Sequence, residues 1–201
     1  MTPITRAVAI ALENGMRAKE QLTKDEGVGS DLIPSVYGFD DKGQPIGYAA
    51  LIEGDNEAGS RQLVEAALVM RRAWGCSVVA FLVEGYTSSP SDDPRSLVER
   101  YPTDDDVNEC LTIHAASSEG ESIHAVQPYT VTVPRRVVWH EPLMRHHHTP
   151  VDGLTKVVAD ILSSVPHEPW VWSFSDGFGA LSDLGFVAVG DEHGWTDEPV
   201  Q

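Results

Sequence analysis

Two histidines, His114 and His124, lie on either side of Ser118-Glu119-Gly120, a short polar segment typical of a hairpin turn. If this segment is a three-residue loop with Gly120 in the left-handed conformation, residues equally distant from Glu119 lie opposite each other. The two imidazoles would then face each other on one side of the hairpin and could ligate a divalent metal. The alternatives are a solvent-facing pair without a ligand, or a two-residue loop whose shifted register separates the histidines.

A second candidate is Glu84, which directly follows the apolar run Val78–Val83. A continuous apolar run predicts a strand buried on both faces, and ligands of open α/β sheets bind beyond the carboxyl ends of such strands. Glu84 is therefore a candidate catalytic acid or base, and Tyr86 a candidate binding residue. The alternative is a strand-end charge that returns to solvent. If this strand neighbours the hairpin, Glu84, His114 and His124 form a set of two histidines and one carboxylate, suited to zinc or iron.

A third candidate is the run His146, His147 and His148, which lies in a segment bounded by prolines, 142–150. Consecutive side chains rarely all reach one metal ion, so the run predicts an exposed polar loop. Metal contact is the alternative, and the three histidines are kept as candidate binding residues.

The established catalytic motifs of other enzymes are missing from this sequence. It has no P-loop, no complete dinucleotide fingerprint, no Gly-x-Ser-x-Gly elbow and no Cys-x-x-Cys pair. Cys76 and Cys110 are predicted to be free, buried thiols, because the sequence has no secretion signal that would favour a disulfide.

The charge of the chain restricts its partners. It has 31 acidic and 14 basic residues, and the formal net charge is −17. Such a surface repels nucleic-acid phosphates and anionic lipids and favours proteins with basic surfaces, so we expect neither nucleic-acid nor membrane binding. With no secretory leader and no membrane-spanning apolar run, the expected location is the cytoplasm of a bacterial host. A DNA mimic is the open alternative, although the acids gather at predicted turns and helix caps.

The spacing of apolar residues predicts the elements that position these candidates. A helix begins at Thr2 and Pro3 and ends near Asp25–Gly29. A hairpin followed by a helix and a buried strand predicts a right-handed parallel crossover, with these elements at 32–39, 45–53, 57–74 and 77–84. The remaining pattern predicts a short helix at 95–101, strands at 109–117, 121–133 and 136–140, a helix from 151, a strand near 170–174, and a loop or hairpin over 177–194.

Together these elements predict an α/β (α+β mixed) fold, with a central mixed sheet of about five to six strands and three main helices. The strands would follow as a hairpin, a parallel crossover and a second hairpin. Residues 1–166 are expected to form a single domain. Residues 167–201 would be an aromatic and glycine-rich extension packed on that domain, ending in a frayed tail.

Part of the chain resembles known proteins. The stretch Ala66–Tyr86, continuing through Asp93-Pro94 into the histidine hairpin, resembles small acidic proteins of actinobacteria and their phages. The resemblance implies a host and a type of genome rather than an activity.

The order of the elements is also similar to that of the JAB/MPN domain. Ser91 and the aspartates that follow it match that domain's serine and aspartate. Residues 84–86 read Glu-Gly-Tyr where the domain would carry His-x-His. This resemblance therefore implies an inactive scaffold rather than a zinc isopeptidase.

The expected function is that of a non-catalytic, acidic protein-binding or accessory module without a cofactor, of phage origin and with an anti-defence or regulatory role. Two alternatives stay open. One is a metal-dependent hydrolase that uses Glu84, His114 and His124 with zinc or another divalent metal. The other is a structural protein of a viral particle. The sequence does not predict the oligomeric state.

Overall fold

The N-terminal helix α1 (Pro3–Asp25) begins at the capping signal that the sequence predicts. The Thr2 hydroxyl accepts a hydrogen bond from the Thr5 backbone N–H, and Pro3 lies in the first turn, where a missing N–H costs nothing. One side of α1 is buried at helical spacing, through Ile4, Ala7, Val8, Ala11, Gly15, Lys19 and Thr23. A lysine in this apolar stripe is the first sign of a buried polar cluster.

The computed structural model describes residues 1–26, 31–52, 58–88, 107–132, 135–148 and 153–190. The other helices are α2 (Ala58–Trp74), α3 (Gly153–Ser164) and α4 (Phe174–Asp183). The strands are β1 (Ser35–Phe39), β2 (Pro45–Leu51), β3 (Val78–Ser88), β4 (Val107–Ser117), β5 (Ser122–Thr132), β6 (Arg136–Trp139), β7 (Leu143–His147) and β8 (Phe186–Gly190). Among these described helices, none combines the length and apolar character that a membrane span requires. The helix predicted at 95–101 and the predicted frayed tail lie outside the described residues.

The strands form one eight-stranded sheet in the order β6-β5-β4-β3-β1-β2-β8, and β7 pairs with β5 as β6 does. Every pairing is antiparallel, so the mixed α+β class is confirmed but the parallel crossover is wrong. The reason is the position of β1, which lies between β2 and β3 and pairs with both. Strands β2 and β3 run in the same direction across α2, but the hairpin partner β1 separates them.

The sheet is larger than the predicted five to six strands, because β7 and β8 fall in segments whose sequence resembles loops. The strand predicted near 170–174 is wrong, because these residues form a turn and the start of α4. In the predicted loop or hairpin, residues 177–190 form the rest of α4 and β8, and residues 191–194 lie outside the described residues. Helix α4 starts at a capping box formed by Ser173 and Asp176. Glycine has a low helix propensity, so Gly177 disfavours α4. No larger residue fits at this position, because a Cβ there would lie 2.5 Å from Trp74 Nε1. Close packing of α4 on α2 therefore explains the glycine.

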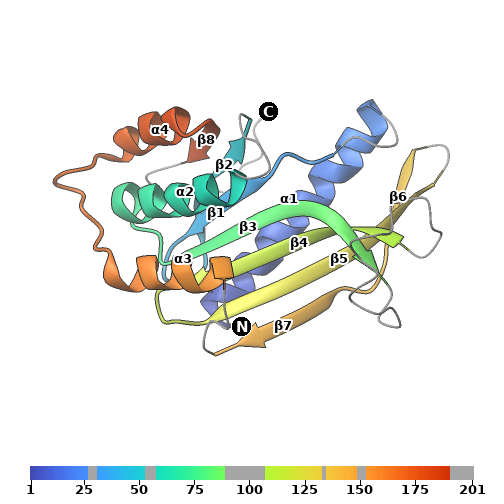
Figure 1. Cartoon of the computed structure of the whole chain (residues 1–201), viewed down its shortest axis with the longest axis horizontal. Helices are drawn as coiled ribbons and strands as arrows, with labels where there is room; N and C mark the ends of the chain where they lie inside the picture. The colour runs from blue at the N-terminus through green and yellow to red at the C-terminus, as the bar shows by residue number, and fades with distance from the viewer. Residues whose placement is uncertain (27–30, 53–57, 89–106, 133–134, 149–152, 191–201) are drawn as a thin grey trace.

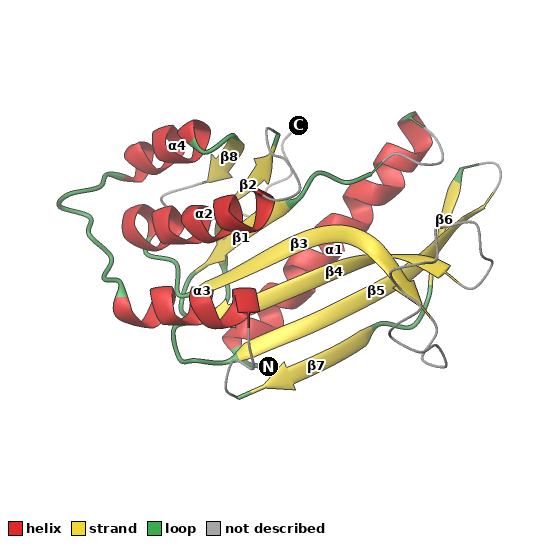
Figure 2. Ribbon diagram, in the orientation of Figure 1, coloured by secondary structure: helices red, strands yellow, loops and turns green. Residues whose placement is uncertain are grey.

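Helices cover the two faces of the sheet unequally, as the ribbon views show (Figure 1, Figure 2). Helices α2, α3 and α4 lie on one face, over a core that includes Met70, Phe81 and Leu162. Helix α1 lies on the other face and packs against β3, β4, β5 and β6, over a core that includes Leu82 and Ile113. Strands β2 and β8 therefore extend the sheet beyond the strands on which α1 packs.

Candidate functional site

The histidine hairpin has the predicted register. Gly120 adopts a φ of 83°, His114 pairs with His124, and their rings stack with centroids 4.6 Å apart and planes 11° apart. His114 also pairs with Phe81, which places both imidazoles on the face of the sheet that carries α2, α3 and α4. The sequence therefore correctly predicts that these two histidines meet.

Burial, together with His124, lowers the pKa of His114, and burial, together with Arg145 and His147, lowers the pKa of His124. The unfolded chain therefore takes up protons at a higher pH than the folded chain. The contribution of these two histidines to the free energy of unfolding is therefore largest above the ordinary imidazole pKa of about 6.5. It declines as the pH falls below that value.

We expect the melting temperature of the wild-type protein to fall more steeply between about pH 7 and pH 5 than that of His114→Gln, because the variant removes one imidazole that is held neutral by folding. The matched control is His140→Gln, at an exposed histidine. Thermal unfolding followed by circular dichroism across this range measures the difference. Equal pH slopes for the wild type and His114→Gln would contradict the assignment.

Glu84 does not join the two histidines. It pairs with Leu111 on β4, three positions along β3 from Phe81, and so lies on the α1 face of the sheet. The predicted set of Glu84, His114 and His124 is therefore divided between the two faces. The condition that the strand of Glu84 neighbours the hairpin is met, because β3 pairs with β4, but the alternation of side chains along β3 directs Glu84 to the other face.

On the α1 face, Glu84 is the centre of a buried polar cluster. Its carboxylate accepts hydrogen bonds from Lys19 Nζ at 2.5 Å, from the Leu32 backbone N–H at 2.5 Å and from the Tyr129 hydroxyl. The side chains of Lys19 and Glu84 are 1% and 7% exposed, and Tyr129 is fully buried. Burial, and then the hydrogen bond to Glu84, raise the pKa of Tyr129. Every donor around Glu84 is satisfied internally, as expected of a cluster that anchors α1 to the sheet. The side chain of Tyr86 lies outside the described residues.

Two of the three consecutive histidines, His146 and His147, lie in the edge strand β7 rather than in a loop, because β7 pairs with β5 from Leu143 to His147. His148 directly follows the strand. Because side chains alternate between the two faces along a strand, neighbouring histidines point to opposite faces. His147 pairs with Ser122 on the face of His124, whereas His146 pairs with Ile123 on the α1 face. His148 returns to the same side as His146, with their ring centroids 5.1 Å apart.

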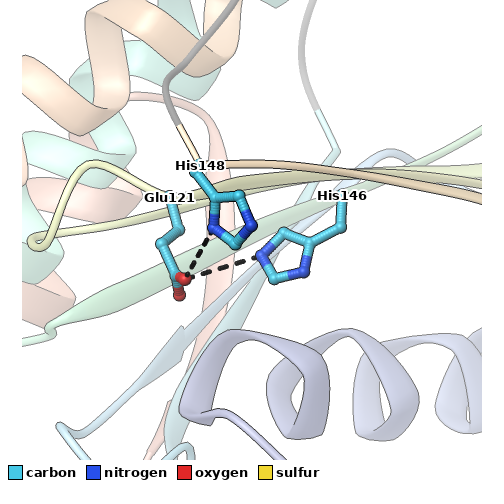
Figure 3. Close-up of side chains that lie close together, drawn as sticks. All are labelled: Glu121, His146 and His148. Carbon is cyan, nitrogen blue, oxygen red and sulfur yellow. Dashed lines mark ion pairs between the residues drawn. The ribbon is translucent and has the colours of Figure 1, made fainter.

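A carboxylate completes this second group of histidines. Glu121, in the turn before β5, lies beside the two rings (Figure 3), with its Oε1 3.7 Å from His146 Nε2 and 3.7 Å from His148 Nδ1. One potential ligand atom from each residue lies within 4.8 Å of the others. Sequence reasoning misses Glu121. The signal that could have revealed it is the His-x-His spacing, which places two imidazoles on one side of a strand beside the turn that holds the acid.

A basic groove lies at the far end of α1. It has a volume of about 640 Å³, and its lining includes Lys24, Arg135 and Arg136 together with Glu20 and Trp139. The Trp139 indole N–H donates to the Glu20 carboxylate at 2.9 Å. The lining thus has more cations than acids, the opposite of the chain as a whole.

An apolar surface lies at the other end of the sheet. Tyr48 and Ala50 of β2 pair with Val189 and Val187 of β8, and the alternate residues of both strands lie in the core beneath α2 and α4. Val187 is 53% exposed, Val189 44%, and Ile52, which directly follows β2, 55%. We call these five residues the outer face. Among the residues that the structure describes, α1 packs closely on β3 to β6 but not on β2 or β8.

Aromatic rings join the outer face to the core beneath α1. Tyr37 stacks on Tyr48 with ring centroids 5.7 Å apart and on Phe39 at 6.5 Å. Burial, with a smaller contribution from Tyr48, raises the pKa of Tyr37 to about 12.

Both cysteines are free and buried, as predicted. Burial raises the pKa of Cys76 to about 12 and also raises that of Cys110. Neither thiol has the lowered pKa that marks a nucleophilic cysteine.

The described chain is therefore an α+β protein with one antiparallel sheet and two separate clusters of histidines on opposite faces. Comparison with protein-family models, with curated proteins and with solved structures finds no match.

Proposed function

We propose that this chain is a non-catalytic protein-binding module whose partner docks on the outer face. The observation that supports this proposal most strongly is the exposure of Ile52, Val187 and Val189. They lie on the same sheet face on which α1 covers strands β3 to β6. Clustered apolar side chains at a protein surface mark interaction sites far more often than isolated ones do. A partner that covers this face would bury the valine and isoleucine side chains as α1 buries those of β3 to β5.

The charge of the chain supports a partner with a basic rim around an apolar centre. A net charge of −17 attracts basic proteins and accelerates their association. The groove at Lys24, Arg135 and Arg136 would repel such a partner locally, and it borders β6, at the opposite end of the sheet from β8. The outer face is therefore the better of these two surfaces for a basic partner. An accessory or anti-defence role agrees with this mode of action.

The geometry supports binding better than the hydrolase alternative. That alternative rests on Glu84 acting with His114 and His124, and these residues lie on opposite faces. The Glu84 carboxylate is also held by Lys19 and Tyr129 beneath α1. A substrate that approached the histidines would not reach it.

The test is capture of partners by immobilised protein from an extract of the cells in which it is naturally made. We expect the wild type to retain a discrete partner at low salt and Val187→Lys with Val189→Lys to bind it at least about tenfold more weakly, because hot-spot contacts at an interface centre carry this much energy. The matched control is Val157→Lys, on α3, where the valine is 46% exposed. Salt should release the partner from the wild type and from the control alike.

Equal capture by the wild type and the double variant would contradict the proposal, as would the absence of any salt-sensitive partner. Because the two valines are exposed, both variants should melt close to the wild-type temperature, which circular dichroism checks.

A further inference from the structure

The end of β7 presents two imidazoles to one carboxylate across the edge of the sheet. His146 is in β7 and His148 directly follows it, and their ring centroids lie 5.1 Å apart, so both imidazoles are on the same side. Glu121 faces them from the neighbouring turn (Figure 3). The residue between the two histidines, His147, lies on the opposite side and takes no part.

We propose that Glu121, His146 and His148 form a binding site for a divalent transition metal, with zinc the best-suited ion. This site is independent of the outer face and of any partner there. Two imidazole nitrogens and one carboxylate oxygen are an established ligand set for zinc, with one coordination position left open.

The distances require only a small adjustment. Bonds of about 2.1 Å to a tetrahedral zinc separate the ligand atoms by about 3.3–3.5 Å. The Glu121 oxygen already lies 3.7 Å from each histidine nitrogen, and no pair in the set exceeds 4.8 Å. Rotation of His148, whose side chain is 88% exposed, can close the remaining gap without moving the backbone.

The backbone that carries the carboxylate is held in place. The Ser117 N–H donates to the Glu121 carbonyl at 3.0 Å, and the Glu121 N–H donates to the Ser117 hydroxyl at 3.2 Å. The pairing of β7 with β5 fixes His146 in the same way. Two of the three ligands are thus positioned before a metal arrives, which lowers the entropy cost of binding. The net charge of −17 also attracts a cation.

A bound ion would join the β4–β5 turn to the end of β7. Strand β7 pairs only with β5 among the described strands, so this end of the sheet gains a cross-link from the metal. Zinc should therefore stabilise the folded protein, because it binds the folded and not the unfolded chain. Solvent can reach this site, since His146 and His148 are both exposed.

The experiment is a titration of untagged, chelator-treated protein with Zn²⁺ by calorimetry, and with Co²⁺ by visible absorption to report the coordination geometry. We expect one zinc per chain, tetrahedral cobalt bands, and a rise in melting temperature of about 5–10 °C at a hundredfold excess over Kd. Loss of a ligand in His146→Ala, His148→Ala or Glu121→Gln should weaken binding at least about tenfold.

The matched control is His147→Ala, which removes a histidine from the same run but from the other face, and it should bind zinc within about twofold of the wild type. The proposal is overturned if the wild type binds no zinc at 100-fold molar excess. It is equally overturned if His147→Ala weakens binding as much as His146→Ala, or if the variant that combines His146→Ala, His148→Ala and Glu121→Gln keeps full affinity. Because all four positions are at the surface, the variants should fold, and circular dichroism verifies this.

Discussion

Replacing Lys19 with methionine should lower the free energy of unfolding by about 3–5 kcal/mol, because it leaves the Glu84 carboxylate buried without its cation. Glu84→Gln should lower the free energy of unfolding by a similar amount. Its amide nitrogen would face at least one of the donors that now converge on the carboxylate, from Lys19, Leu32 and Tyr129. Urea denaturation followed by tryptophan fluorescence measures both effects.

The double variant Lys19→Met with Glu84→Gln should lose clearly less free energy of unfolding than the two single variants together, because the two side chains form one buried ion pair. The control is Lys156→Met, which breaks an exposed pair with Asp160 at 3.0 Å and should cost less than about 1 kcal/mol. A structural role for this cluster would be refuted if the losses in free energy of unfolding were additive. It would also be refuted if Lys19→Met lost as little as the control.

Truncation of Trp74 to alanine should destabilise the protein by about 3–5 kcal/mol, because the indole is almost fully buried between α2 and α4. Its ring lies 5.2 Å from those of both Phe174 and Phe178, and its N–H donates to the Phe174 carbonyl at 3.0 Å. Trp74→Phe keeps most of the packing and loses the hydrogen bond, so it should cost about 1 kcal/mol plus a smaller packing loss.

Hydrogen exchange distinguishes a local from a global effect of Trp74→Ala. We expect the amides of α4 and β8 to lose protection first, because α4 packs on α2 and contacts β8. The outer face would then be disturbed, since β8 supplies Val187 and Val189. Unchanged protection of β8 in a variant that is destabilised overall would show that Trp74 does not support this edge of the sheet.

Local patterns in the sequence predict the parts of the fold whose determinants are close along the chain. The cap at Thr2 and Pro3 predicts the start of α1, and the Gly120 turn predicts both the hairpin and the meeting of His114 with His124. These features depend on turn chemistry and on side-chain alternation, which a single sequence carries.

The features that the sequence does not predict depend on contacts between distant segments. Nothing near β1 indicates that it separates β2 from β3, so the sequence predicts a parallel crossover, whereas each of these strands pairs with β1 in the antiparallel sense. Helix α4 contains Gly177 and Gly179 and is stabilised by packing against Trp74 on α2. Tertiary contacts of this kind override local propensity.

The candidate sites follow the same division. Sequence reasoning finds the histidines, but it assigns their carboxylate to Glu84 because that residue ends a buried strand. The register of β3 instead directs Glu84 toward Lys19, and the pairing of β7 with β5 brings His146 to Glu121. Register and edge pairing are properties of the assembled sheet, so the correct carboxylate becomes visible only in three dimensions.

The most direct test of the outer face as a docking surface is photo-crosslinking from a residue within it. A photoreactive amino acid is placed at position 187 in one preparation and at position 157, on α3, in another, and both are irradiated in an extract of the natural host. We predict a discrete adduct with a second protein from position 187 and none from position 157. Adducts formed only within the chain or with a second copy of it, or equal yields from the two positions, would contradict the account.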